Sequence, residues 1–134
     1  MNSIQREIQV KIGEKAFSAK FPNVGQMIDM ESLKQALTSN RYGVMSASGV
    51  KSMFIALDLV DAIAFFQVCV PQIAKHYDIK NYAGMQLDDI RDITEAYLQQ
   101  VKPWYDKLLK QLYTATDGGN ETTTEGEDID GESK

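Results

Sequence analysis

Apolar residues occupy every second position in residues 8–12 and again in residues 17–21 of the chain. This alternation predicts two β-strands, each with one apolar face. Residues 13–15 between them, Gly-Glu-Lys, predict a three-residue turn with a G1-type bulge. Pro22 cannot donate a hydrogen bond to a sheet, so it predicts the end of the second strand. We therefore expect a β-hairpin over residues 4–21.

Two neighbouring apolar stripes run along residues 24–37 at the spacing of an α-helix. The first stripe contains Val24, Met27 and Ile28 together with Glu31, and the second contains Met30, Leu33 and Leu37. Pro22 has the fixed φ angle that suits the entrance of such a helix. Because an isolated two-stranded hairpin is only marginally stable in water, we expect the hairpin to pack on a helix or on another chain.

The longest apolar run, MFIALDLVDAIAFFQVCV, occupies residues 53–70 and is followed by Pro71, which stops or kinks a helix. Its length is just sufficient to cross a bilayer. However, Asp58 and Asp61 lie inside the run, and each would cost about 2.5–3.5 kcal/mol at a bilayer centre. The run therefore predicts the central helix of a small bundle rather than a membrane span.

The C-terminal half of the chain contains two further helical patterns. Residues 87–101 place apolar residues on one face with a helical period, and Pro103 interrupts this pattern. Residues 104–113 begin a last amphipathic helix. These patterns predict a predominantly helical α+β fold, in which an N-terminal β-hairpin is followed by a small bundle of four to five helices over residues 23–115.

The net charge of the sequence changes sharply near Thr116. Residues 116–134 contain seven acidic residues and one lysine, a net charge of −6, whereas the first 115 residues contain 13 basic and 12 acidic residues, a net charge of +1. Ile129 is the only apolar residue of the acidic segment. Such a segment cannot bury enough apolar surface to offset its ordering entropy. We therefore predict one folded domain over residues 1–115 and a disordered acidic tail over residues 116–134.

Few residues offer catalytic or metal-binding chemistry. The one histidine, His76, has no assured nucleophile or acid beside it, and the one cysteine, Cys69, lies in an apolar run. A reactive thiol needs an electropositive, accessible site, so Cys69 is interpreted as a small core residue. Asp58 and Asp61 could form a carboxylate pair, but polar contacts between helices or subunits are the favoured interpretation. The sequence therefore predicts that the protein is not an enzyme and has no cofactor or metal.

The composition also indicates the cellular compartment of the protein and the classes of partner that it binds. A single cysteine is typical of a reducing, intracellular compartment, and the polar residues 1–7 argue against a signal peptide. Basic residues are dispersed along the chain, so we expect no nucleic-acid footprint. Other protein chains are the expected partners, with homo-oligomerisation left open, and no membrane partner is expected.

Two apolar helix faces supply the candidate partner-binding positions. These positions are Val24, Met27, Ile28, Trp104, Leu108 and Leu112. Aromatic and large aliphatic anchors of this kind dominate the energetics of protein interfaces. For the helix that starts at Trp104, packing against the chain's own central helix is the alternative interpretation.

The segment AFSAKFPNVGQMIDMESLKQAL, followed by RYG and then by LDLVDAIAFFQVCVP, resembles small tail-region proteins of tailed bacteriophages. Among these it is most similar to the tail assembly chaperone-like proteins, through a hairpin, a Phe-Pro pair, an amphipathic helix and a helical body over about residues 8–75. The resemblance implies a protein that is not an enzyme and uses no cofactor. It implies binding to the long, aggregation-prone tape measure protein in the host cytoplasm, before the tail tube polymerises around it.

Three other functions stay open at this point. A structural virion subunit, such as a tail-completion, neck or baseplate component, would use the hairpin for subunit contacts. A small hydrolase or metal-dependent enzyme would use Asp58 and Asp61. A bacterial regulatory or adaptor protein would have no viral link.

Overall fold

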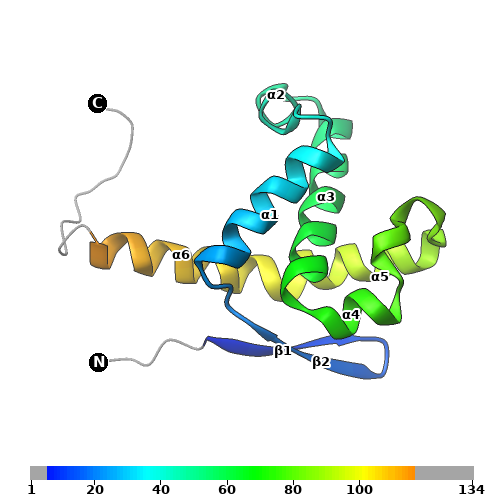
Figure 1. The fold of residues 1–134 in the computed structure, drawn as a ribbon, viewed down its shortest axis with the longest axis horizontal. Helices are drawn as coiled ribbons and strands as arrows, with labels where there is room; N and C mark the ends of the chain where they lie inside the picture. Colours follow the sequence, from blue (N-terminus) through cyan, green and yellow to red (C-terminus); the bar gives the residue numbers. More distant parts are fainter. Residues whose placement is uncertain (1–5, 117–134) are drawn as a thin grey trace. The chain divides into compact units, whose positions relative to one another are not determined.

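The computed structural model describes residues 6–116, in which a two-stranded antiparallel hairpin is followed by six α-helices (Figure 1). The first elements are β1 (Glu7–Ile12), β2 (Lys15–Lys20), α1 (Val24–Leu37), α2 (Tyr42–Ala47), α3 (Lys51–Cys69) and α4 (Pro71–His76). They are followed by the 3-10 helix η1 (Ile79–Gly84), α5 (Leu87–Ala96), the π-helical turn η2 (Tyr97–Val101) and α6 (Lys102–Thr116). The predicted α+β, predominantly helical fold is confirmed, with more helices than the four to five expected.

Contacts divide the chain into two compact units, Met1–Lys102 and Pro103–Lys134. The first unit holds the hairpin, α1 to α5 and the turns η1 and η2, and the second holds nearly all of α6. The expectation of one folded domain over residues 1–115 stays a prediction. Apart from Thr116, the predicted acidic tail lies outside the described residues.

The hairpin turn is tighter than predicted. Ile12 pairs with Lys15, so the turn contains two residues, Gly13 and Glu14. Gly13 has a φ angle of +63°, as the first central position of a type II′ turn requires. The predicted three-residue bulged turn is therefore wrong, because a two-residue primed turn matches the twist of the strands and leaves Lys15 free to join the ladder.

The apolar side chains of both strands lie on one face, as the alternation predicts. Val10 pairs with Phe17 and Ile8 pairs with Ala19, and Val10 and Ala19 are fully buried. This face packs on the helical body, where the ring of Phe17 lies 6.1 Å from that of His76 in α4. Packing on helices thus stabilises a hairpin that would be marginal alone.

The core of the first unit lies around the second half of α3. Phe65 and Phe66, both fully buried, form an aromatic cluster with Tyr97 of η2, with ring centroids 5.6 to 6.3 Å apart. Six other large side chains are also fully buried: Val10, Val70, Ile73, Ile79, Ile93 and Val101. The central helix predicted from the apolar run is therefore confirmed for its C-terminal half.

The two prolines that follow long helical patterns act differently. Pro71 is the first residue of α4 and α3 ends at Cys69, which confirms the predicted boundary. Pro103 is the second residue of α6, a helix that follows the π-helical turn η2 directly. Because the first turn of a helix tolerates a residue without an N–H group, the helical path continues past Pro103, with the change from π to α geometry at Lys102.

The loop predicted over residues 39–43 is shorter in the structure, because α2 begins at Tyr42. Ser39 and Asn40 have positive φ angles of 53° and 64°. The Asn40 N–H group donates to the Gln35 carbonyl at 2.8 Å, a closure typical of helix C-termini. α2 has only six residues, too few for a periodic pattern to reveal it.

Candidate partner-binding surface

α1 is a well-defined helix that is packed on one side. At its start, the Asn23 side chain accepts from the Gln26 N–H group at 2.8 Å, and the Gln26 side chain accepts from the Asn23 N–H group at 2.9 Å. This capping box satisfies two backbone donors that the helix itself leaves unpaired. On the packed side, Met30 is buried and its Sδ lies 3.6 Å from Sγ of Cys69 in α3.

The other side of α1 exposes large apolar side chains. Val24 and Ile28 are 72% and 63% exposed. A shallow hollow of about 480 Å³ is lined by Val24, Met27, Ile28, Glu31, Ser32 and Gln35, and we call this surface the α1 outer face. Three of the six predicted contact positions therefore lie together, on a helix whose shape is already fixed.

The remaining three predicted contact positions belong to α6, in the second unit. Leu112 is 36% exposed, Trp104 is half-buried and Leu108 is buried, with 4% exposed. A buried side chain offers little area to a partner, so Leu112 and, in part, Trp104 are the accessible members of the three. A contact role for these residues stays a prediction.

A second exposed apolar surface lies at the start of α3 and was not predicted from the sequence. Met53, Phe54 and Ile55 are 38%, 45% and 61% exposed. Three consecutive residues span much of the circumference of a helix, so the first turn of α3 stands clear of the core. Val44 in α2 and Val50 before α3 are 72% and 50% exposed, and the five residues form the α3 tip. The sequence feature that could have predicted this surface is the length of the apolar run over residues 53–70, because the run contains more apolar side chains than the core buries.

Among the described residues, one helix, Lys51–Cys69, is long and apolar enough by length and composition to cross a membrane. In its most apolar stretch, 39% of the residues are buried inside the protein. Core helices of soluble proteins often meet the same criterion, so a single helix of this kind is weak evidence for a membrane span.

Asp61 connects three helices through polar contacts. It accepts a hydrogen bond from the Tyr42 hydroxyl of α2 at 2.6 Å, and Nζ of Lys34 in α1 lies 3.7 Å from the same carboxylate oxygen. Lys34 also pairs with Glu31 at 2.9 Å and lies 5.4 Å from the centre of the Tyr42 ring. The interpretation of Asp61 as a polar contact between helices is therefore confirmed.

Burial has the largest effect on the pKa values of Asp61 and Tyr42. Burial raises the pKa of Asp61 above its ordinary value, although the Tyr42 hydrogen bond and the charges of Lys34 and Lys102 act to lower it. Burial and the neighbouring Asp61 also raise the pKa of Tyr42. Within residues 6–116, no group of three or more His, Cys, Asp or Glu side chains is placed to hold a metal ion. The arrangement therefore ties helices together and offers no hard-cation site.

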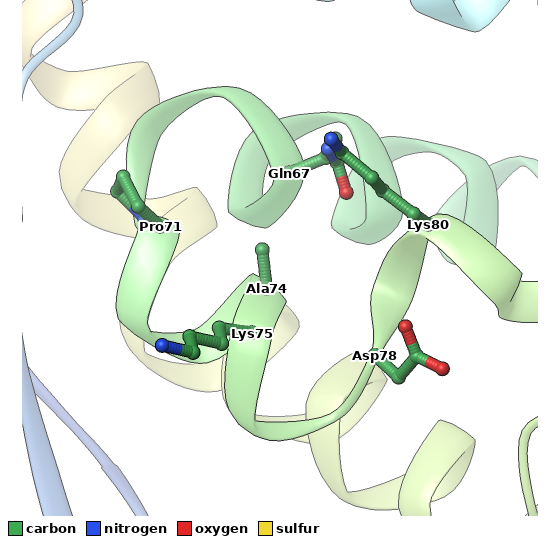
Figure 2. Close-up of a pocket in the computed structure, with 6 residues that line it drawn as sticks. All are labelled: Gln67, Pro71, Ala74, Lys75, Asp78 and Lys80. Atoms are coloured by element: carbon green, nitrogen blue, oxygen red, sulfur yellow. The ribbon is translucent and has the colours of Figure 1, made fainter.

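A hollow of about 510 Å³ lies between the end of α3, α4 and η1 (Figure 2). Its lining residues are Gln67, Pro71, Ala74, Lys75, Asp78 and Lys80. Oε1 of Gln67 is buried and accepts no hydrogen bond within the described part of the chain. Ordered water normally satisfies a buried oxygen of this kind. The charged side chains around it are exposed, and the lining contains no nucleophile with a base beside it.

His76 and Cys69 lie in structural surroundings. His76 is the exposed last residue of α4, and its ring centre lies 4.7 Å from that of Tyr77. Cys69 is half-buried beside Met30, and burial raises the pKa of its thiol to about 12. The interpretation of Cys69 as a small core residue therefore holds in part, because its side chain is half-buried at the edge of the core.

We expect Cys69 to react with a disulfide reagent at pH 8 at least about 100-fold more slowly than a free cysteine. A thiol with a pKa of about 12 is about 0.01% thiolate at pH 8, compared with about a quarter for an ordinary cysteine. The rate of release of the coloured thiolate measures this difference. Unfolding in urea provides the control, since it should restore the ordinary rate. Equal rates in the folded and unfolded protein would contradict the expectation.

The α1 outer face is therefore the leading candidate site, and the α3 tip is a second exposed apolar surface. Both can bind apolar protein surface. In comparisons with known proteins, no family model, no curated protein and no solved structure matches this chain.

Proposed function

We propose that the protein binds other protein chains through the α1 outer face. The observation that carries this proposal is the exposure of Val24 and Ile28, 72% and 63%, on a helix that is capped at one end and packed on its other side. A fixed apolar helix face suits the apolar stripe of a second helix, which contributes anchors at the same spacing. Because the helix is already formed, binding would order few additional residues.

The proposed biological role is tail assembly in a tailed bacteriophage. The protein would chaperone a long helical tail protein, such as the tape measure protein, in the cytoplasm of the host cell. The resemblance over about residues 8–75 suggests this role, and that segment includes all of α1. The proposed role involves no reaction and no cofactor.

A structural virion subunit is the second candidate. In this role the protein would be a tail-completion, neck or baseplate component, and the hairpin would make the subunit contacts. The two-stranded sheet β1–β2 has no third strand among the described residues, which favours this candidate because such a sheet can accept another strand.

Co-expression with the products of neighbouring genes, followed by size-exclusion chromatography with light scattering, separates the two candidates. We expect a monomer or small oligomer that co-elutes with a long helical partner. A closed ring or tube formed by the protein alone would contradict the chaperone role and support the virion subunit.

The double variant Val24→Asp with Ile28→Asp is expected to reduce the amount of co-purified partner at least tenfold. Each introduced carboxylate would be desolvated in the apolar interface without a counter-charge. Since both positions are exposed in the free protein, the melting temperature should change by only a few degrees.

Leu87→Asp is the matched control, because Leu87 is 82% exposed on α5 and lies outside the α1 outer face. This variant should retain full partner binding. Equal losses in both variants, or no loss in the double variant, would contradict a role for the α1 outer face.

A further inference from the structure

The two edges of the hairpin differ in their free backbone groups. The Phe21 N–H group donates to the Arg6 carbonyl at 2.8 Å, next to the pair Glu7–Lys20. In an antiparallel ladder, hydrogen-bonded and non-hydrogen-bonded pairs alternate. The backbone groups of Ala16, Ser18 and Lys20 therefore face away from β1, and those of Glu7, Gln9 and Lys11 face away from β2.

The edge of β1 is closed at Lys11. The Gln100 side chain of η2 accepts from the Lys11 N–H group at 2.7 Å and donates to the Lys11 carbonyl at 2.8 Å. It thus occupies both backbone groups that an added strand would use at this position. The outward backbone groups of Ala16, Ser18 and Lys20, like those of Glu7 and Gln9, form no hydrogen bond with any described residue, so β2 is the edge that is open at all three positions.

A groove of about 570 Å³ lies along this open edge of β2. Its lining residues are Ser18, Lys20, Phe21, Asn23, Gln26, Cys69, Val70, Pro71 and Gln72. β2 supplies one wall, and the start of α1 with the junction between α3 and α4 supplies the other residues. An extended segment in the groove could therefore pair with β2 and place alternate side chains between the walls.

The chemistry of the groove favours an acidic occupant. Lys20 is its one ionised lining residue, and the carboxylate of Glu7, opposite Lys20 in the ladder, already accepts a hydrogen bond from Ser18. The side-chain oxygens of Asn23 and Gln26 are used in the capping box of α1, which leaves their amide NH₂ groups as donors. Phe21 and Pro71 add apolar surface for one aliphatic side chain.

We propose that the groove beside β2 binds an extended, acidic peptide segment of another protein chain, which adds as a third strand to the hairpin. The segment would pair with the outward backbone groups of Ala16, Ser18 and Lys20, and its carboxylates would lie near Lys20 and the two amide donors. This binding extends the proposed protein-binding function, but it uses a different surface from the α1 outer face.

A fluorescent version of the peptide Ac-TEVDVE-NH₂ is a suitable probe, with Ac-TKVKVK-NH₂ as its charge-reversed twin. We expect fluorescence anisotropy to show saturable binding of the acidic peptide to the full chain below about 1 mM, and binding of the twin at least tenfold weaker. The backbone N–H groups of Ala16, Ser18 and Lys20 should then exchange with solvent at least tenfold more slowly in NMR spectra. Absence of saturation at millimolar peptide would overturn the proposal.

Ser18→Pro is the decisive variant, and Gln9→Pro is its matched control. Ser18 and Gln9 face each other in the ladder, and the N–H group of each points away from the partner strand. Proline at an outward position keeps the β1–β2 ladder but removes one edge donor. We expect Ser18→Pro to weaken peptide binding at least tenfold and Gln9→Pro to leave it unchanged. Equal affinities for the two variants would overturn the proposal.

Two further measurements show whether the peptide binds in this groove or elsewhere on the chain. Lys20→Gln removes the charge of an exposed side chain without placing a second carboxylate opposite Glu7, and it should weaken binding of the acidic peptide at least tenfold without unfolding the protein. Val24→Asp with Ile28→Asp should leave peptide binding intact. The experiment can therefore contradict the proposed role of the α1 outer face without contradicting the peptide site beside β2, and the reverse. If the peptide binds only a chain that ends at residue 116, the occupant is this chain's own acidic segment, and the assignment to another chain is wrong.

Discussion

Phe66→Ala is expected to lower the free energy of unfolding by about 3–5 kcal/mol, a loss typical of a fully buried aromatic side chain. Phe66 is fully buried, and its ring packs edge-on against Phe65 at 5.6 Å and against Tyr97 at 6.3 Å. The substitution removes buried apolar area and leaves a cavity between α3 and η2, which rigid neighbours can fill only in part. Urea unfolding followed by circular dichroism measures the loss.

Phe54→Ala is the matched control for this substitution on the same helix. Phe54 is 45% exposed at the α3 tip, so the same truncation should cost less than about 1 kcal/mol. If the two variants lost equal stability, the first turn of α3 would belong to the core, and the α3 tip would not be an available apolar surface.

The second large effect is expected at Asp61, where Asp61→Ala should lower the free energy of unfolding by about 2–3 kcal/mol at pH 7. This variant leaves the Tyr42 hydroxyl and the Lys34 ammonium without the acceptor that they share in the wild-type protein. Asp61→Asn keeps an oxygen that can accept from Tyr42 and removes the charge. We therefore expect Asp61→Asn to be at least as stable as the wild type at pH 7.

The raised pKa of Asp61 determines the direction in which stability changes with pH. The pKa of Asp61 is raised in the folded protein, so the folded state holds the carboxyl proton more tightly than the unfolded state, whose pKa is about 3.9. Ionisation of Asp61 therefore lowers stability as the pH rises from about 4 through the folded pKa, and the effect is constant above it. The stability of Asp61→Asn relative to the wild type should rise over that window.

Tyr42→Phe tests the cause of the pH effect. This variant removes the hydrogen bond that acts to lower the pKa of Asp61, so the loss of stability with rising pH should become larger. Chemical unfolding at a series of pH values from about 3 to about 8 measures all three proteins. A wild-type protein that gains stability relative to Asp61→Asn as the pH rises would show that the carboxylate is favoured, contrary to the burial argument.

Local patterns predicted the fold because the strands and long helices carry their own periodicity. Alternation placed Val10 and Phe17 on one face, and Pro71 marked the end of α3. The prediction of the turn was wrong because the choice between a two-residue and a three-residue turn depends on whether Lys15 pairs with Ile12, which the alternation does not determine. α2 was missed because its six residues make fewer than two turns of helix, which cannot show a period.

The candidate site was predicted less completely than the fold. The apolar stripe with Val24 and Ile28 was found, because a helix with two apolar stripes has more apolar surface than one packed side uses. The α3 tip was missed, because hydrophobicity alone does not say which end of an apolar run the neighbouring elements cover. The groove beside β2 depends on contacts distant in the sequence, including that between Gln100 and Lys11, and no local pattern encodes them.

The hydrogen bonds between Gln100 and Lys11 also limit how far this protein can polymerise. Endless growth of a cross-β filament requires each subunit to offer two usable edges, one that receives a strand and one that donates the next attachment point. Here an incoming strand at β1 would first have to displace the Gln100 side chain from both backbone groups of Lys11. Strand addition at β1 is therefore hindered at Lys11, whereas β2 is open at all three of its outward positions, so a single captured segment or a closed pair of subunits is the expected end product.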